Sequence, residues 1–237
     1  MQHSNNNPMF ERVFGDIDEK YFNGLNEIKE MGFSFDDFIG QSPLFTGHVN
    51  IARYLAMYES FKQVLDISGH YADVGTWNGA GFLYIAKLIK IFEPYSAFQV
   101  HAFDWFKGQG PNQNNKKTNY IGDYDRLIKL LHIQNLQDKA VVHNIDLINE
   151  LEAFSRDPIY SSIYYKYVYL DCGVKDVLTN TVPFFWDRMV NGGIMLFDHF
   201  GSDIVEETEI VMQTLPKGAV IKQYPFTRQP MGYIKKS

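Results

Sequence analysis

The chain has 237 residues with 22 basic and 28 acidic side chains, a net charge of −6, and its length suits one α/β domain. The acidic balance argues against a nucleic-acid partner, which would need a basic face to meet phosphates. Cys172 is the only cysteine, which excludes an intramolecular disulfide and any site built from several cysteines.

Two amphipathic helices are predicted first, at residues 16–31 and 47–68, because apolar side chains recur there at intervals of three and four. From residue 69 the pattern changes to short apolar runs, each followed by a helical stretch. The predicted strands are 70–74, 98–103, 140–143, 167–170 and 193–197, and the predicted helices are 80–91, 120–134, 145–155, 175–190 and 203–214.

Five such β–α steps predict an α/β fold with a doubly wound, mostly parallel sheet that helices cover on both faces. The tail adds an antiparallel pair at 220–224 and 232–236, which brings the sheet to seven strands. We expect residues 1–45 to form an N-terminal extension and helical cap, and residues 46–237 to form the main domain. Residues 107–119 have almost no apolar side chains and predict a long loop, which is usually functional or disordered.

A glycine-containing turn follows the first predicted strand, with the spacing Asp73-x-Gly75-x-x-x-Gly79. Glycines at such a turn let the backbone approach a ligand. A dinucleotide fingerprint fails, because Tyr84 stands where G-x-G-x-x-G requires its third glycine, and Asp104 lies 29 residues after Gly75. The turn therefore favours a ligand without a pyrophosphate. Asp73 can accept a hydrogen bond from an ammonium group, and Asp104 can accept from both ribose hydroxyls.

This turn, followed by an aspartate at the end of the second strand, resembles the class I S-adenosylmethionine methyltransferases. More narrowly, the segment from Asp104 to Gly108 (DWFKG) resembles the D-x-F-x-G segment of the macrocin O-methyltransferase family. The strand ends LDCG at 170–173 and NGGIMLFDHFG at 191–201 are similar to later motifs of that family. The resemblance covers about residues 46–200 and implies methyl transfer to a hydroxyl of a sugar or sugar-containing metabolite.

The resemblance also implies roles for individual residues. The family holds a divalent cation with acids near the acceptor hydroxyl, but this chain has Gly173 and His199 where two of those acids are typical. The remaining metal candidates are Asp171, Asp198 and His199, with magnesium or a softer ion left open. The catalytic candidates are His199 and Asp171. If no metal is bound, His199 could itself be the base that takes the hydroxyl proton. The predicted cofactor residues are Asp73, Gly75, Thr76, Trp77, Gly79, Asp104, Trp105 and Asp146.

Plainer interpretations stand beside these roles. Asp146 could meet the adenine or merely cap the following helix, Trp77 could pack on the ligand or the core, and Asp198-His199 could be a simple turn. Two other functions are considered: binding of S-adenosylmethionine without turnover, and a nicotinamide-dependent oxidoreductase. The expected partner is a small molecule such as a nucleotide sugar, and a homo-oligomer is left open.

Location is predicted from two features of the chain. The first ten residues lack the basic start and apolar core of a secretory signal. The best apolar stretch, residues 82–92, is short and contains Lys87 and Lys90, so no membrane partner is expected. A cytoplasmic location follows as an expectation.

Overall fold

The structure is a computed structural model that describes residues 24, 26–108, 120–201, 207–227 and 231–237. Most of the first predicted helix and most of the predicted 107–119 loop therefore lie outside the described residues. Residues 26–30 are helical, and two short elements follow, α3 (Phe35–Gly40) and the 3-10 helix η2 (Ser42–Leu44). Among the described residues, none of the helices has the length and apolar character needed to cross a bilayer.

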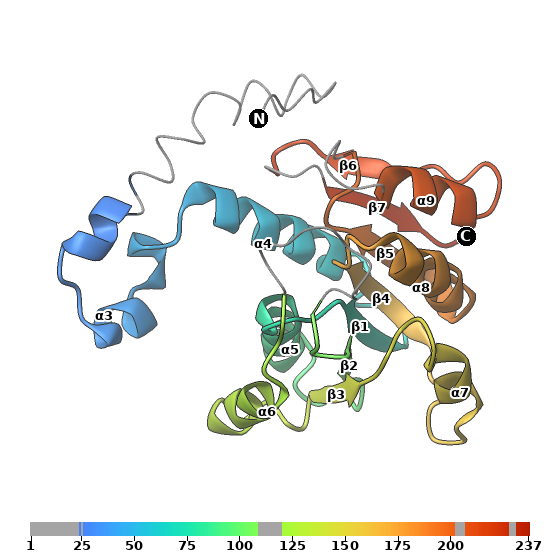
Figure 1. Cartoon of the computed structure of the whole chain (residues 1–237), viewed down its shortest axis with the longest axis horizontal. Helices are drawn as coiled ribbons and strands as arrows, with labels where there is room; N and C mark the ends of the chain where they lie inside the picture. The colour runs from blue at the N-terminus through green and yellow to red at the C-terminus, as the bar shows by residue number, and fades with distance from the viewer. Residues whose placement is uncertain (1–23, 25, 109–119, 202–206, 228–230) are drawn as a thin grey trace.

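Seven strands form one sheet in the order β3-β2-β1-β4-β5-β7-β6 (Figure 1). The first five strands pair in parallel, while β7 pairs antiparallel with β5 and with β6. The strand order reverses beside β1, which lies between β2 and β4, and ligands of such sheets bind at the carboxyl ends of the strands at this point. The strands are β1 (His70–Val74), β2 (Val100–Asp104), β3 (Ala140–Asn144), β4 (Tyr165–Leu170), β5 (Met189–Phe197), β6 (Lys222–Tyr224) and β7 (Met231–Lys235).

Helices cover both faces of the sheet, as the sequence predicts (Figure 1). One apolar core joins the sheet to α4, α5 and α6, and a second joins the opposite face to α7, α8 and α9. In β4 the side chains alternate between the two cores, with Tyr167 and Tyr169 in the first and Val168 and Leu170 in the second. The helices are α4 (His48–Lys62), α5 (Ala80–Phe92), α6 (Tyr124–Ile133), α7 (Leu151–Arg156), α8 (Lys175–Asp187) and α9 (Glu207–Thr214).

Two helices begin later than their apolar periodicity predicts, because an aspartate side chain binds backbone N–H groups just before them. Asp123 accepts from the N–H of Arg126 at 2.9 Å and caps α6. Asp146 accepts from the N–H groups of Ile148 and Asn149, at 2.9 and 3.3 Å. These bonds form a separate turn, so the helix predicted at 145–155 is shortened to α7.

Three histidines form a hydrogen-bonded row across β1, β2 and β3. His101 Nδ1 lies 2.9 Å from His143 Nε2, and His101 Nε2 lies 3.1 Å from His70 Nδ1. Because His70 Nδ1 also accepts from the N–H of Gln99 at 3.2 Å, it is an acceptor, and His101 must donate to it. With a neutral His101 ring, Nδ1 accepts from the Nε2–H of His143, so the contacts set the tautomers along the row.

This row predicts that the protein loses stability in acid. Burial lowers the pKa of His101 to about 2 and that of His143 to about 4, whereas an unfolded histidine titrates near 6.5. Below pH 6.5 these histidines bind protons in the unfolded chain but stay unprotonated in the folded chain. The free energy of unfolding therefore decreases as the pH falls. At pH 5 we expect a loss of about 2 kcal/mol for each of these two histidines, measured by urea unfolding at pH 7.5 and 5.

The control for this prediction is His143→Phe, which keeps an aromatic ring among the aromatic neighbours of His143. Its free energy of unfolding should depend less on pH than that of the wild type, whatever its stability at pH 7.5. Equal pH dependence in the two proteins would contradict the assignment to this row.

Candidate active site

The glycine turn between β1 and α5 brings the backbone close to the end of β4. Gly75 and Gly79 have φ angles of +86° and +85°, a region that glycine tolerates best. A Cβ atom at Gly75 would collide with the backbone oxygen of Asp171. A Cβ at Gly81 would lie 2.7 Å from Asp73 Oδ2. Glycine at these positions therefore lets the turn pack directly against the end of β4 and the Asp73 carboxyl.

Asp73 lies under this turn and is 2% exposed. Its Oδ1 accepts from the hydroxyl of Thr76 at 2.8 Å, so Thr76 stabilises the turn through its side chain. Burial raises the pKa of Asp73 to about 7. An ammonium group arriving beside this carboxyl would favour its ionised form, which fits the predicted contact with the amino-acid part of the cofactor.

Asp104 ends β2 and ties two loops together. One of its oxygens accepts from the N–H of Trp77 and the other from the N–H of Phe106, each at 2.7 Å. Burial raises the pKa of Asp104. Each carboxylate oxygen has a second lone pair, so the fixed carboxylate can still accept from two vicinal hydroxyls.

The other predicted cofactor residues differ in their surroundings. Trp77 is 44% exposed, and its ring meets Tyr120 edge-on, with centroids 5.4 Å apart, so it is available to a ligand. The indole N–H of Trp105 donates to the backbone oxygen of Gly108. Both carboxylate oxygens of Asp146 accept hydrogen bonds within its own turn: Oδ1 from backbone N–H groups, and Oδ2 from the side-chain amide of Asn149 at 2.8 Å. Its contact with adenine stays a prediction.

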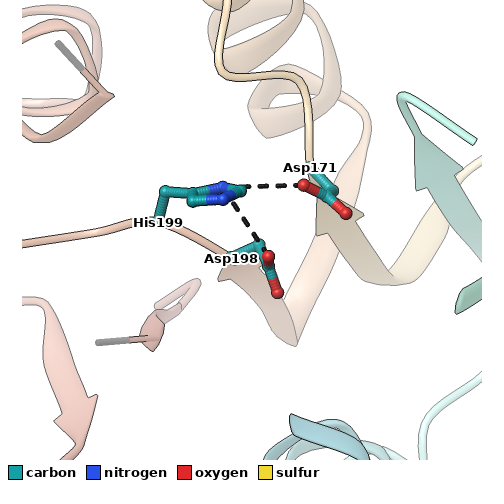
Figure 2. Close-up of side chains that lie close together, drawn as sticks. All are labelled: Asp171, Asp198 and His199. Carbon is teal, nitrogen blue, oxygen red and sulfur yellow. Dashed lines mark ion pairs between the residues drawn. The ribbon is translucent and has the colours of Figure 1, made fainter. Parts of the chain in front are cut away.

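Asp171 and Asp198 follow neighbouring strands in register. Leu170 pairs with Phe197, and the N–H of Asp198 donates to the backbone oxygen of Leu170 at 3.0 Å. The ring of His199 lies beside both acids (Figure 2), with Nδ1 at 3.5 Å from Asp171 Oδ1 and 3.6 Å from Asp198 Oδ2. The structure therefore brings together the three residues that the sequence predicts as the acceptor end of the site.

Two further residues, which the sequence analysis did not identify, contact both acids. Arg53 of α4 forms ion pairs with Asp171 and with Asp198, the latter at 3.1 Å. The hydroxyl of Tyr169 donates to Asp198 Oδ1 at 2.7 Å and accepts from Arg53 Nε at 2.9 Å. Burial raises the pKa of Asp171, and the neighbouring charge of Asp198 raises it further.

One feature of the sequence does mark Arg53 as a residue that needs a partner. It lies in the same stripe of α4 as Val49, Ala56 and Met57, which are buried. A charged side chain within an apolar stripe needs a partner, although the partner's identity depends on the fold.

Glu207, the first residue of α9, also contacts the site. It is fully buried, and its Oε1 accepts from the N–H of His199 at 3.0 Å. Burial raises the pKa of Glu207 well above its usual value, and its hydrogen bond fixes the backbone at His199.

The three predicted metal ligands match a divalent ion by spacing. One ligand atom from each of Asp171, Asp198 and His199 lies within 4.8 Å of the others. Two ligands that bind an ion at about 2.1 Å with tetrahedral angles are about 3.4 Å apart, close to the distances from His199 Nδ1. Among the residues that the structure describes, none forms a hydrogen bond with the buried Nδ1 of His199. By charge the match is poorer, because Arg53 already pairs with both carboxylates. That an ion binds there stays a prediction.

The sheet order and the glycine turn define a Rossmann-like methyltransferase fold, as the sequence predicts, and comparison with solved structures confirms it. No family model and no curated protein matches the chain. The calicheamicin methyltransferase CalS11 is similar, with a TM-score of 0.79 and 16% identity over 93% of each chain. The apo structure of CalS11, described as a TDP-rhamnose 3'-O-methyltransferase, gives a TM-score of 0.72 and 17% identity over 92% of this chain and 93% of that one.

Two other solved O-methyltransferases share this fold. NovP has a TM-score of 0.63 and 11% identity over 81% of this chain and 84% of that one. An O-methyltransferase from Bacillus cereus, solved in complex with SAH, has a TM-score of 0.52 and 10% identity over 97% and 96% of the two chains. At these identities the likeness shows the fold.

Proposed function

We propose that the protein is an S-adenosylmethionine-dependent O-methyltransferase that acts on a hydroxyl of a sugar or sugar-containing metabolite. The observation that carries this proposal is the convergence of Asp171, Asp198 and His199 beside the glycine turn, where Gly75 touches the backbone of Asp171. Cofactor candidates and acceptor candidates thus meet at one edge of the sheet. The similarity to CalS11 supports a nucleotide sugar as the first acceptor to test.

The residues at this edge can prepare a hydroxyl for attack. S-adenosylmethionine supplies a methyl group on a positively charged sulfur; its carbon–sulfur bond breaks as the new carbon–oxygen bond forms. With its proton on Nδ1, facing Asp171 and Asp198, His199 has a lone pair on Nε2 that can take the proton of the acceptor hydroxyl. The two carboxylates then stabilise the imidazolium.

A divalent ion is the second candidate for activating the hydroxyl, and the spacing of the three ligand atoms supports it. Asp171, Asp198 and His199 would hold the ion, which would lower the pKa of a bound hydroxyl. Both versions need a positive species between His199 Nδ1 and the carboxylates, either a proton or a metal ion.

The direct test is formation of S-adenosylhomocysteine from S-adenosylmethionine with a panel of nucleotide sugars and phenols. Turnover with a sugar acceptor supports the proposal. Binding of the cofactor without turnover on any acceptor would favour a binding protein. Tight NAD binding would favour an oxidoreductase and overturn the proposal.

For the cofactor end, Asp104→Ala is expected to weaken S-adenosylhomocysteine binding about 10- to 150-fold, the effect of losing a charge-assisted hydrogen bond of about 1.5–3 kcal/mol. Calorimetry on the purified variant measures this dissociation constant. Asp138→Ala is the control, because Asp138 lies in an exposed ion pair with Lys90. An unchanged dissociation constant for Asp104→Ala would remove this residue from the cofactor site. Asp146→Ala in the same assay tests the adenine contact.

A further inference from the structure

Arg53 lies at the acceptor end of the site, and the proposed function assigns it no role. It comes from α4, 118 residues before Asp171 in the chain, and its side chain is 37% exposed. Its Nη2 binds Asp171 Oδ2 and its Nε lies 3.1 Å from Asp198 Oδ1. A guanidinium presents several N–H donors in a fixed plane and keeps its charge at any pH that the protein tolerates.

Arg53 and His199 use opposite oxygens of the same two carboxylates. Arg53 faces Asp171 Oδ2 and Asp198 Oδ1, while His199 Nδ1 faces Asp171 Oδ1 and Asp198 Oδ2. Each acid therefore bridges a permanent cation and the imidazole. The hydroxyl of Tyr169 joins the same arrangement, since it accepts from Arg53 and donates to Asp198.

The charges in this cluster leave little attraction for a divalent ion. The two carboxylates contribute two negative charges, and Arg53 offsets one of them. Among the described residues, Glu207 binds the backbone N–H of His199 and is not one of the three residues whose ligand atoms lie within 4.8 Å of one another. Asp171, Asp198 and Arg53 together carry one net negative charge, and Arg53 occupies one oxygen of each acid, whereas hard divalent ions usually bind where several oxygen ligands are free.

We infer that Arg53 is the resident cation of this site and that His199 accepts the hydroxyl proton without a divalent ion. The inference rests on the proposed function and decides between its two versions. The proton moves from the acceptor oxygen to His199, and Asp171 and Asp198, held by Arg53, stabilise the charged ring. Arg53 is therefore a positioning residue: it fixes the carboxylates and does not need to touch the acceptor.

The experiment compares the full-length wild type with Arg53→Met and Arg53→Lys. The wild type is expected to retain full turnover in excess EDTA. In calorimetric titrations with Mn²⁺ and Mg²⁺, Arg53→Met should bind the ion about tenfold or more tightly than the wild type, because one positive charge has gone and two carboxylate oxygens are free. Arg53→Lys keeps the charge and should bind the ion as weakly as the wild type.

Arg156→Met is the matched control, because Arg156 forms an ion pair with Glu152 at the exposed surface of α7. Its ion affinity should equal that of the wild type. Loss of wild-type turnover in EDTA, or an Arg53→Met variant that binds Mn²⁺ no more tightly than the wild type, would overturn the inference. The titrations need no acceptor, so they test Arg53 even if no acceptor is methylated and the proposed function fails.

Discussion

Replacing His199 with alanine is expected to lower the rate of methyl transfer by about 100- to 10,000-fold, the contribution of a positioned general base. The imidazole is the group that the two carboxylates orient, with Nδ1 at 3.5 Å from Asp171 and 3.6 Å from Asp198. These separations exceed a hydrogen bond, and we expect them to shorten when the acceptor binds. Single-turnover rates with a saturating nucleotide sugar measure the effect.

The affinity for S-adenosylhomocysteine separates a chemical defect from a folding defect. His199 follows β5, whereas the predicted cofactor residues lie at the carboxyl ends of β1, β2 and β3 or just after them, so His199→Ala should bind S-adenosylhomocysteine as tightly as the wild type. His132→Ala, on the exposed surface of α6, is the control and should keep the full rate. If His199→Ala also kept the full rate, neither the base nor the metal version of the proposed function would stand.

The core of this fold is predictable because local patterns and the sheet agree. The prediction for β1 matches the structure at both ends, since Tyr71 and Val74 are strand-forming residues and a glycine turn follows them. The meeting of Asp171, Asp198 and His199 also follows from local information: parallel strands bring their carboxyl ends to one edge of the sheet. Register then sets the distance, through the pairing of Leu170 with Phe197.

Arg53 could not be assigned in the same way, because its partners depend on packing between distant segments. The amphipathic pattern of α4 predicts which face is buried, but it does not tell which strand end that face meets. Helix α7 begins later than predicted for a local reason, since the bonds of Asp146 compete with a first helical turn. Side-chain chemistry, which apolar periodicity ignores, decides both cases.

The start of β4 also differs from the prediction, because the pairing of a buried charge is not visible in apolar periodicity. The predicted strand begins at residue 167, but β4 begins at Tyr165 and includes Lys166, which is fully buried. A lysine is rarely buried unless it is paired, and sequence alone gives no partner. In the structure, Lys166 Nζ lies 2.7 Å from Glu93 Oε1 at the end of α5, and the hydroxyl of Tyr71 donates to the other oxygen of Glu93.

Breaking this buried pair should destabilise the protein strongly. Lys166→Met removes the charge but keeps most of the apolar stem, which leaves the Glu93 carboxylate, only 14% exposed, without its cation. We expect the free energy of unfolding to fall by about 3–5 kcal/mol, the cost of leaving a buried charge unpaired. Urea unfolding at pH 7.5 measures it. Lys90→Met is the control: its pair with Asp138 is exposed and should contribute about 1 kcal/mol or less.

The double variant Lys166→Met with Glu93→Gln shows whether charge is the cause. The side-chain amide oxygen introduced by Glu93→Gln can still accept from the hydroxyl of Tyr71, while no unpaired charge remains at the end of α5. A buried ion pair replaced by neutral groups often costs little, so the double variant should be more stable than Lys166→Met alone, although it carries one more substitution. If instead the double variant were less stable, the loss in Lys166→Met would come from packing around β4 and not from the unpaired carboxylate.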